Sequence, residues 1–376
     1  MPPPVDPETV AFLKKFENSF SKTLERSGAP GAVVSVVVDT SKFSKGFGTR
    51  DMKTGKKVDQ HTIFRIGSLS KGFAAVLAGI VAGEGKLDFD EKVKDIVPNF
   101  KLKDSLQTER ISIKHILSHS TGLPRHAYTN LVEADVPMDQ IINELGSVDL
   151  IAKEGEIYSY QNATFGIIEK ILTNKTGKEF NHLLKEKILR PANMSRSTTK
   201  HLDLIKDSNV AMPHLFSANK NSFVRGKLSD KYFYLASTGG IALSGKDMST
   251  WLSILLGNHP EIISDEELDQ VFEPILPTKS RKYYDRWSDN PTEYALGWRK
   301  IDLDTVQLMH HTGFVNNYRS EIAIDRKNKI GVCVLFNSFV TEAKEVVPAF
   351  LSAFGEKVLV GKNIEGDQAP EELPAN

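Results

Sequence analysis

Cysteine is almost absent from this sequence of 376 residues, which contains only Cys333. A single thiol excludes disulfide bonds within the chain and any metal site made of several cysteines. Cys333 lies in the apolar run Ile330–Phe336, where a small buried side chain is expected rather than a reactive thiol. His115 and His119 are four residues apart, but the Glu of a His-Glu-x-x-His zinc motif is missing between them. We therefore expect neither a metal nor a cofactor.

Net charge and long hydrophobic runs are lacking too. Lys and Arg together number 48, as do Asp and Glu, so no excess charge favours nucleic acid or an anionic membrane as a partner. No stretch is apolar for long enough to span a bilayer, and the start Met1-Pro-Pro-Pro-Val-Asp6 lacks the segments of a signal peptide. We expect a small molecule or short peptide as substrate, no nucleic acid and no membrane span. The oligomeric state stays open, and so does the compartment: periplasmic or secreted for a form whose signal has been removed, cytoplasmic otherwise.

Two common catalytic motifs are missing as well. No Gly-x-Ser-x-Gly occurs, which argues against an α/β-hydrolase. No Gly-x-x-x-x-Gly-Lys-Ser/Thr loop is present to bind phosphates. An α/β-hydrolase and a P-loop nucleotide-binding protein are therefore less favoured.

Strand patterns lie near both ends of the chain, and helical patterns fill the middle. Apolar spacing predicts an amphipathic helix over residues 7–27, and another apolar helix is expected over 341–360. Phe73–Ala82 is apolar on nearly every side, which predicts a buried helix. Apolar and β-branched runs predict strands at Gly31–Val38, Phe43–Gly48, Ile63–Ile66, Tyr294–Trp298, Val306–His310, Tyr318–Ile324 and Ile330–Phe336.

This order of elements predicts an α/β fold, an antiparallel sheet flanked by N- and C-terminal helices with an inserted, mostly helical lobe. The sheet portion would comprise residues 8–85 and 290–360, and the lobe residues 86–289. The acidic tail at 361–376 is expected to be disordered. A cleft between the lobe and the sheet is the expected place for a site.

A Ser-x-x-Lys pattern can activate a serine, because the two side chains face each other across one helical turn. It occurs four times, at Ser19, Ser68, Ser197 and Ser217. Only Ser68 follows an extended apolar segment and opens a buried helix, where burial lowers the pKa of Lys71 as a base requires. The alternative on this segment alone is an ordinary helix-capping serine followed by a surface lysine.

Two further motifs accompany Ser68. Tyr160-Gln-Asn162 directly precedes a helical pattern at Phe165–Leu172, so its tyrosine can relay protons and its asparagine can bind an amide. His311-Thr-Gly313 stands just before the predicted strand Tyr318–Ile324, and its glycine permits a close approach of the backbone. The Lys-Thr-Gly matches at 53–55 and 175–177 and the Ser288-Asp-Asn290 match are interpreted as coincidental.

Several stretches, taken in order, resemble the serine hydrolases of the class C β-lactamase and penicillin-binding protein family over roughly residues 8–357. They are Phe64-Arg-Ile-Gly-Ser-Leu-Ser-Lys71, Gly83-Glu-Gly-Lys-Leu-Asp88, Ile116-Leu-Ser-His-Ser-Thr-Gly-Leu-Pro124, Tyr160-Gln-Asn162, Arg190-Pro-Ala-Asn-Met194 and His311-Thr-Gly313. The resemblance implies an acyl-enzyme on Ser68, with Lys71 and Tyr160 as acid and base and with Asn162 positioning the substrate. It also implies an oxyanion hole at the main-chain N–H groups of Ser68 and Phe314.

The third motif departs from true β-lactamases, because His311 stands where they carry lysine. This pattern resembles family esterases and D-amino-acid peptidases. A neutral imidazole does not provide a fixed cation for a substrate carboxylate, so Arg319 or His310 would have to take that role.

Three functions therefore remain in view. The first is a serine hydrolase or acyltransferase acting on an ester or amide. The second is a β-lactamase or penicillin-binding D,D-carboxypeptidase with the same chemistry. The third is a catalytically silent binding or scaffold relative. The sequence leaves the acyl donor and the acyl acceptor open.

Overall fold

A nine-stranded sheet forms the base of the protein in the computed structural model, which describes residues 7–278, 291–303 and 306–355. Neighbouring strands of this sheet pair antiparallel throughout the described segments. In spatial order the strands are β3 (Lys56–Lys57), β2 (Ser41–Asp51), β1 (Gly31–Val38), β14 (Ile330–Phe336), β13 (Tyr318–Asp325), β12 (Val306–Val315), β11 (Arg299–Leu303), β10 (Thr292–Tyr294) and β9 (Leu276–Pro277). Strands from the two ends of the chain meet where β1 pairs with β14.

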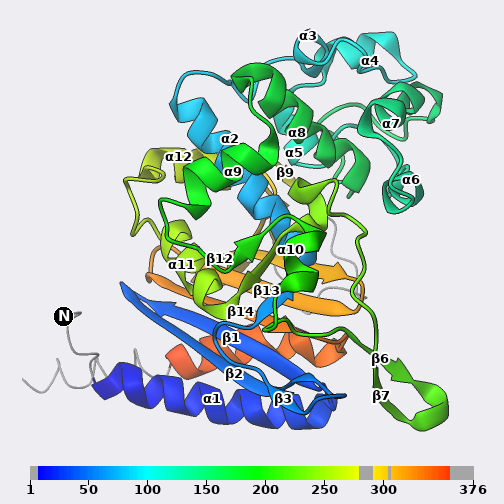
Figure 1. The fold of residues 1–376 in the computed structure, drawn as a ribbon. Coiled ribbons are helices and arrows are strands. Elements are labelled where there is room, and N and C mark those ends of the chain that lie inside the picture. Colours follow the sequence, from blue (N-terminus) through cyan, green and yellow to red (C-terminus); the bar gives the residue numbers. More distant parts are fainter. Residues whose placement is uncertain (1–6, 279–290, 304–305, 356–376) are drawn as a thin grey trace, which may run out of the picture.

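Both faces of this sheet are covered, which explains why β1 and β14 are continuous apolar runs. One face packs against α1 (Pro7–Ser27) and the helix at 346–355. The other packs against α2 (Ser70–Gly83) and α11 (Gly245–Leu255). Figure 1 shows α1 beneath the sheet and α2 on its other side, running up toward the helical part. Cys333 is 1% exposed in β14, as its apolar surroundings predicted.

The segment between β4 (Ile63–Arg65) and β9 is mostly helical (Figure 1). Beside α2 and α11, its helices are α3 (Val93–Ile96), α4 (Ser105–Arg110), α5 (Ile113–Leu117), α6 (Thr129–Glu133), α7 (Met138–Glu144), α8 (Asn162–Thr176), α9 (Phe180–Leu184), α10 (His201–Lys206) and α12 (Asp265–Phe272). Short strands β5 (Ser197–Thr198) and β8 (Ala242–Ser244) join β4, and β6 (His214–Ser217) pairs with β7 (Ser222–Arg225). The predicted fold class is confirmed. Within the described segments, no helix has both the length and the apolar character needed to cross a membrane.

The structure can be compared with the predicted terminal helices and with the motif matches that were interpreted as coincidental. Residues 7–27 form α1, and the end of the chain begins with a turn at Thr341–Glu345 followed by a helix at 346–355. The predictions for 356–360, for the tail at 361–376 and for Ser288-Asp-Asn290 lie outside the described residues. Lys-Thr-Gly at 53–55 is the turn between β2 and β3, and at 175–177 it ends α8 at Gly177, as expected.

One predicted strand is wrong. Of the segment Tyr294–Trp298, only Tyr294 belongs to a strand, and the following residues turn back toward β11. Gly297 adopts φ +72°, and a Cβ there would lie 2.9 Å from the main-chain oxygen of Lys71. The chain therefore turns here because a glycine can pack directly against α2, which an apolar pattern cannot reveal.

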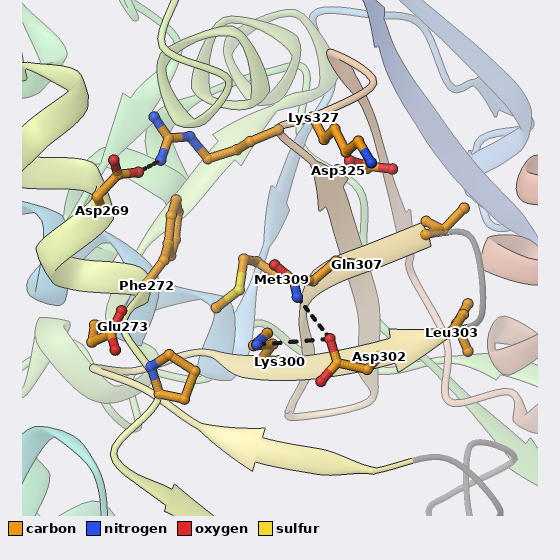
Figure 2. A pocket seen from close by; sticks show the side chains of 13 residues that line it. Asp269, Phe272, Glu273, Lys300, Asp302, Leu303, Gln307, Met309, Asp325 and Lys327 are labelled. Carbon is orange, nitrogen blue, oxygen red and sulfur yellow. Dashed lines mark hydrogen bonds and ion pairs between the residues drawn. The ribbon is translucent and has the colours of Figure 1, made fainter.

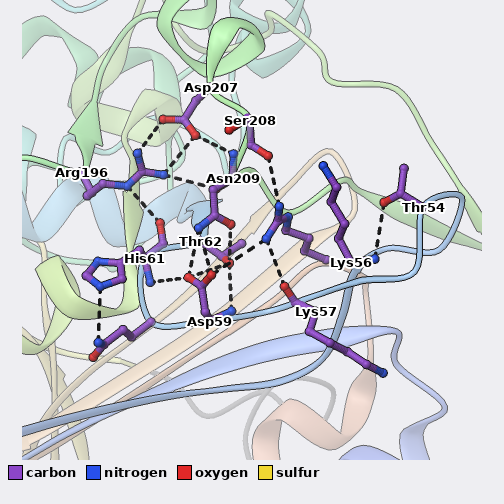
Figure 3. Close-up of polar contacts among 12 residues, drawn as sticks. Thr54, Lys56, Lys57, Asp59, His61, Thr62, Arg196, Asp207, Ser208 and Asn209 are labelled. Carbon is purple, nitrogen blue, oxygen red and sulfur yellow. Dashed lines mark hydrogen bonds and ion pairs between the residues drawn. The ribbon is translucent and has the colours of Figure 1, made fainter.

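A polar cluster fixes the segment that leads into β4 (Figure 3). Arg196 binds both carboxylate oxygens of Asp207, at 2.7 and 3.0 Å, and donates to the main-chain oxygen of His61 at 3.0 Å. The Thr62 hydroxyl donates to Asn209 Oδ1 at 2.8 Å. Paired, partly buried groups of this kind hold a main-chain segment in one place. The cluster thus anchors the start of the strand that ends just before Ser68.

Candidate active site

Ser68 lies in a single helical turn, η1 (Gly67–Leu69), directly before α2. The α-helix itself begins two residues later than the sequence pattern suggested, at Ser70. Lys71 is nevertheless on the neighbouring turn, and its Nζ lies 3.3 Å from Ser68 Oγ. The predicted pairing of these two side chains is therefore present in the structure.

Lys71 is fully buried, with 0% of its surface exposed. Two oxygens accept its N–H groups, Asn162 Oδ1 at 2.8 Å and the main-chain oxygen of Thr238 at 2.9 Å. Burial lowers the pKa of the Lys71 amine well below its ordinary value. A neutral amine has two N–H groups and one lone pair. With both N–H groups donated to these oxygens, the lone pair is left to face Ser68 Oγ.

Tyr160 contacts the same serine from the other side. Its hydroxyl donates to Ser68 Oγ at 2.7 Å. Burial raises the pKa of the Tyr160 phenol well above its ordinary value, although the hydrogen bond to Ser68 opposes this effect. Tyr160 therefore stays protonated at neutral pH and acts as a hydrogen-bond donor, which leaves Lys71 as the group able to accept the serine proton.

His311 is held as a neutral ring by two hydrogen bonds. Its Nδ1 lies 2.8 Å from the main-chain oxygen of Thr312, which can only accept, so Nδ1 carries the proton. Its Nε2 then accepts the hydroxyl of Tyr294 at 3.0 Å. Burial is the main cause that lowers the pKa of His311 well below its ordinary value. This third motif lies before β13, as predicted, but within β12, which extends past the predicted end at His310 to Val315.

Two glycines let the main chain of β12 lie against the turn that carries Ser68. A Cβ on Gly67 would lie 2.8 Å from the main-chain nitrogen of Phe314, and a Cβ on Gly313 would lie 2.2 Å from the main-chain oxygen of Ile66. Gly67 also adopts φ +54°, a conformation that favours glycine. The main chain of Phe314 is thereby placed against the residue that precedes Ser68.

Arg319 meets the third motif at its main chain, since its Nη1 donates to the main-chain oxygen of Gly313 at 3.4 Å. Side chains alternate between the two faces along β13. Ser320 bonds to the main chain before Ser68 and Ile322 packs in the core around α2, so Arg319 starts from the opposite face. There its Nη2 lies 4.0 Å from Glu321 Oε2, and His310 lies 3.1 Å from Glu321 Oε1.

Three contributors were missed from the sequence. Thr238 acts through a main-chain oxygen, which no side-chain pattern marks. Tyr294 was assigned only to a strand, and its bond to His311 depends on how β10 and β12 are placed. His119 was considered only as a metal ligand, but its ring lies 4.4 Å from that of Tyr160 and its Nδ1 accepts the main-chain N–H of Gln161 at 3.2 Å.

A separate hollow of about 620 Å³ lies at the other end of β12. Figure 2 shows Lys300 and Gln307 pointing toward Asp302. Lys300 Nζ and Gln307 Nε2 lie 3.7 and 2.8 Å from Asp302 Oδ1, and Asp269 pairs with Arg326. The lining of this hollow includes none of Ser68, Lys71, Tyr160, Asn162 and His311. Across the described residues, no three His, Cys, Asp or Glu side chains gather closely enough to hold a metal ion.

The fold defines a class, that of the β-lactamases and penicillin-binding proteins. A solved structure of the octameric penicillin-binding protein homologue from Pyrococcus abyssi superposes with a TM-score of 0.78, over 93% of this chain and 77% of that one, at 24% identity. At this identity the likeness establishes the fold alone.

The sequence model of the beta-lactamase family matches residues 16–354, and the chain belongs to that family. Among curated proteins it is similar to the unguisins hydrolase ungD' of Aspergillus campestris, with 26% identity over 82% of this chain and 58% of that protein. It is also similar to protein flp of Staphylococcus aureus, with 24% identity over 84% of this chain and 61% of that protein. The chain thus spans about three fifths of the length of these relatives.

The close approach at Gly67 gives a direct test of the site's geometry. We expect Gly67→Ala to lower the free energy of unfolding by about 2 to 4 kcal/mol, because the new Cβ meets the Phe314 main chain at an already unfavourable φ. Gly55→Ala is the matched control, since Gly55 has φ +68° but nothing lies within 4 Å of its Cβ position. Urea unfolding measures both variants, and equal losses would contradict the proposed contact.

Proposed function

We propose that this protein is a serine hydrolase that forms an acyl-enzyme on Ser68 with an ester or amide substrate. The observation that carries the proposal is the position of Ser68 Oγ, between the Tyr160 hydroxyl at 2.7 Å and the buried Lys71 amine at 3.3 Å. A hydroxyl held against a neutral amine is an activated nucleophile. One relative, the unguisins hydrolase ungD', is named as a hydrolase, which agrees with this proposal.

In the proposed reaction, Lys71 takes the Ser68 proton as Oγ bonds to the substrate carbonyl carbon. The negative charge that develops on the carbonyl oxygen would be stabilised by the main-chain N–H groups of Ser68 and Phe314. When the bond to the leaving group breaks, Tyr160 donates a proton to that group and regains one from Lys71. Water then attacks the acyl-enzyme by the reverse sequence and releases the acid.

Asn162 has two tasks in this proposal. Its Oδ1 orients Lys71, and its Nδ2 is available to a substrate carbonyl once it leaves the Tyr232 hydroxyl, to which it donates at 3.3 Å. His311, Thr312 and Gly313 would form the wall beside the substrate. We assign no substrate contact to Arg319, because its side chain starts from the opposite face of the sheet.

The neutral state of His311 suggests the class of substrate. Tyr294 and the Thr312 carbonyl occupy both ring nitrogens, so the ring offers no positive charge to a carboxylate. We therefore propose that the substrate carries no carboxylate next to the ester or amide bond that is cleaved. Similarity in fold to a penicillin-binding protein homologue keeps a β-lactamase or D,D-carboxypeptidase as the second candidate. A stable or hydrolysed adduct of a β-lactam on Ser68, measured by intact mass, would favour it.

Replacing the nucleophile tests the main proposal and the silent alternative together. Ser68→Ala should lower hydrolysis of a short-chain p-nitrophenyl ester by about 10³-fold or more and abolish labelling by a fluorophosphonate. Ser217→Ala is the matched control, because it removes the serine of another Ser-x-x-Lys pattern and should keep full activity. Undiminished hydrolysis by Ser68→Ala, or no hydrolysis by the unaltered protein, would contradict the proposal.

The protonation state of Lys71 gives a second test, through the pH dependence of acylation. Only the neutral amine can accept the serine proton, so the rate should rise as pH increases through the lowered pKa of Lys71 and then stay level. A lysine of ordinary pKa, near 10.4, would keep the rate rising to about pH 10. The burst of p-nitrophenol measures this rate. Lys71→Arg, which stays charged, should remove the burst at every pH.

The identity of residue 311 tests the substrate class. His311→Lys should raise acylation by a carboxylate-bearing β-lactam, relative to a neutral ester, by about tenfold, which corresponds to about 1.4 kcal/mol. His311→Gln is the control, because it keeps a neutral partner for Tyr294 and should not change the ratio. An unchanged ratio in a folded His311→Lys protein, with folding checked by thermal melting, would contradict the assignment.

A further inference from the structure

The oxygen of Thr238 that holds Lys71 belongs to a short helical turn, η5 (Ala236–Gly240). Thr238 Oγ1 donates to the main-chain oxygen of Leu235 at 3.2 Å, and Ile241 N donates to Ser70 Oγ at 3.3 Å. The turn therefore lies directly against the start of α2. Its shape decides whether Thr238 presents its oxygen to the Lys71 amine.

One stripe of α8 contacts this turn and the residues leading into it. Asn162, Gly166 and Glu169 follow each other at intervals of four and three, so they lie on one helix face. Asn162 Nδ2 donates to the Tyr232 hydroxyl at 3.3 Å. Gly166 lets the helix approach, because a Cβ there would lie 2.7 Å from Leu235 Cδ2.

Glu169 completes the stripe with a contact to the turn itself. Its Oε1 accepts the main-chain N–H of Ser237 at 2.7 Å. The first N–H groups of a helical turn have no partner within it, and a carboxylate is a strong acceptor for such a group. Ser237 directly precedes Thr238, so this bond fixes the peptide unit that lies two before the one whose oxygen holds Lys71.

Glu169 has no part in the proposed acyl transfer, and no ion pair is found for it within the described segments. We propose that Glu169 is a positioning residue, which holds Ser237 N–H and thereby keeps the Thr238 oxygen in place to orient Lys71 toward Ser68. This inference rests on the proposed acyl-enzyme function and adds a residue that does not touch the substrate.

The charge of Glu169 gives the inference a distinctive readout. Burial raises the pKa of this carboxyl group to about 7, although the Ser237 N–H opposes the rise. Above this pKa the group is a carboxylate and its bond to Ser237 is charge-assisted; below it the protonated group is a weaker acceptor. Orientation of Lys71 should therefore weaken as pH falls through about 7. A glutamine accepts the same N–H but does not titrate.

The experiment compares Glu169→Leu and Glu169→Gln in acylation by a p-nitrophenyl ester from acid to alkaline pH. Glu169→Leu should slow the acylation step by about 10- to 100-fold, the scale expected when a reacting group is displaced, with KM less affected. Glu169→Gln should acylate within about threefold of the unaltered protein at alkaline pH and lose the ionisation near pH 7. Glu144→Leu, which removes an exposed carboxylate of α7, should leave both rate and profile unchanged.

Acylation at the unaltered rate by a folded Glu169→Leu protein would overturn the inference. If that variant does not fold, the glutamine variant decides: an unchanged pH profile overturns the inference and a lost ionisation supports it. Failure of the underlying function is separately visible, because Ser68→Ala would then hydrolyse the ester normally. Labelling of Ser68 with no response to Glu169 substitution would overturn only the positioning role.

Discussion

A buried lysine amine, for which the described part of the chain offers no charged partner, is the constraint around which this site is arranged. Leaving such a group charged in a low-dielectric interior is costly, so the protein must keep it neutral and satisfy its N–H groups. Three separate parts of the chain meet this demand: α2 provides Lys71, α8 provides Asn162 and η5 provides the Thr238 oxygen. The same requirement directs the remaining lone pair at Ser68. The same hydrogen bonds therefore satisfy the N–H groups of Lys71 and prepare the amine for its proposed role as a base.

The sheet contributes the other side of the site through main-chain contact. Gly67 and Gly313 remove the side chains that would hold β12 away from the turn carrying Ser68. The hydroxyl of Ser320 bonds to the Ile66 oxygen at 2.8 Å and adds a polar link to this contact. The side chain of Phe314 is exposed, so its main chain is placed by the pairing of β12 with β13 and by the contact at Gly67. The proposed oxyanion-binding N–H groups thus depend on strand pairing as well as on the turn that carries Ser68.

In the proposed function, His311 influences which substrate is accepted and takes no part in the acyl transfer itself. The two nitrogens of the His311 ring are taken by Tyr294 and Thr312, and its ring centroid lies 6.5 Å from that of Tyr160. A family member with this nucleophile can accordingly differ in the charge of the substrate it accepts. The unguisins hydrolase and the penicillin-binding protein homologue illustrate how widely the names attached to one fold can vary. The fold alone does not choose among them.

The sequence by itself indicated the longer strands β1, β2, β12, β13 and β14 and the N-terminal helix, because apolar spacing directly reflects which faces are buried; the short strands β3, β9 and β11 were not predicted. It also indicated Ser68 among four equal patterns, since only that serine precedes a helix apolar on every side. It did not determine the turn at 295–298, the face from which Arg319 starts, or the partners Thr238 and Tyr294. Those features depend on strand pairing and on main-chain atoms, which have the same chemistry at every position. Only the tertiary structure, by bringing α2, α8, η5 and β12 together, decided which oxygens surround Lys71 and which charge His311 can carry.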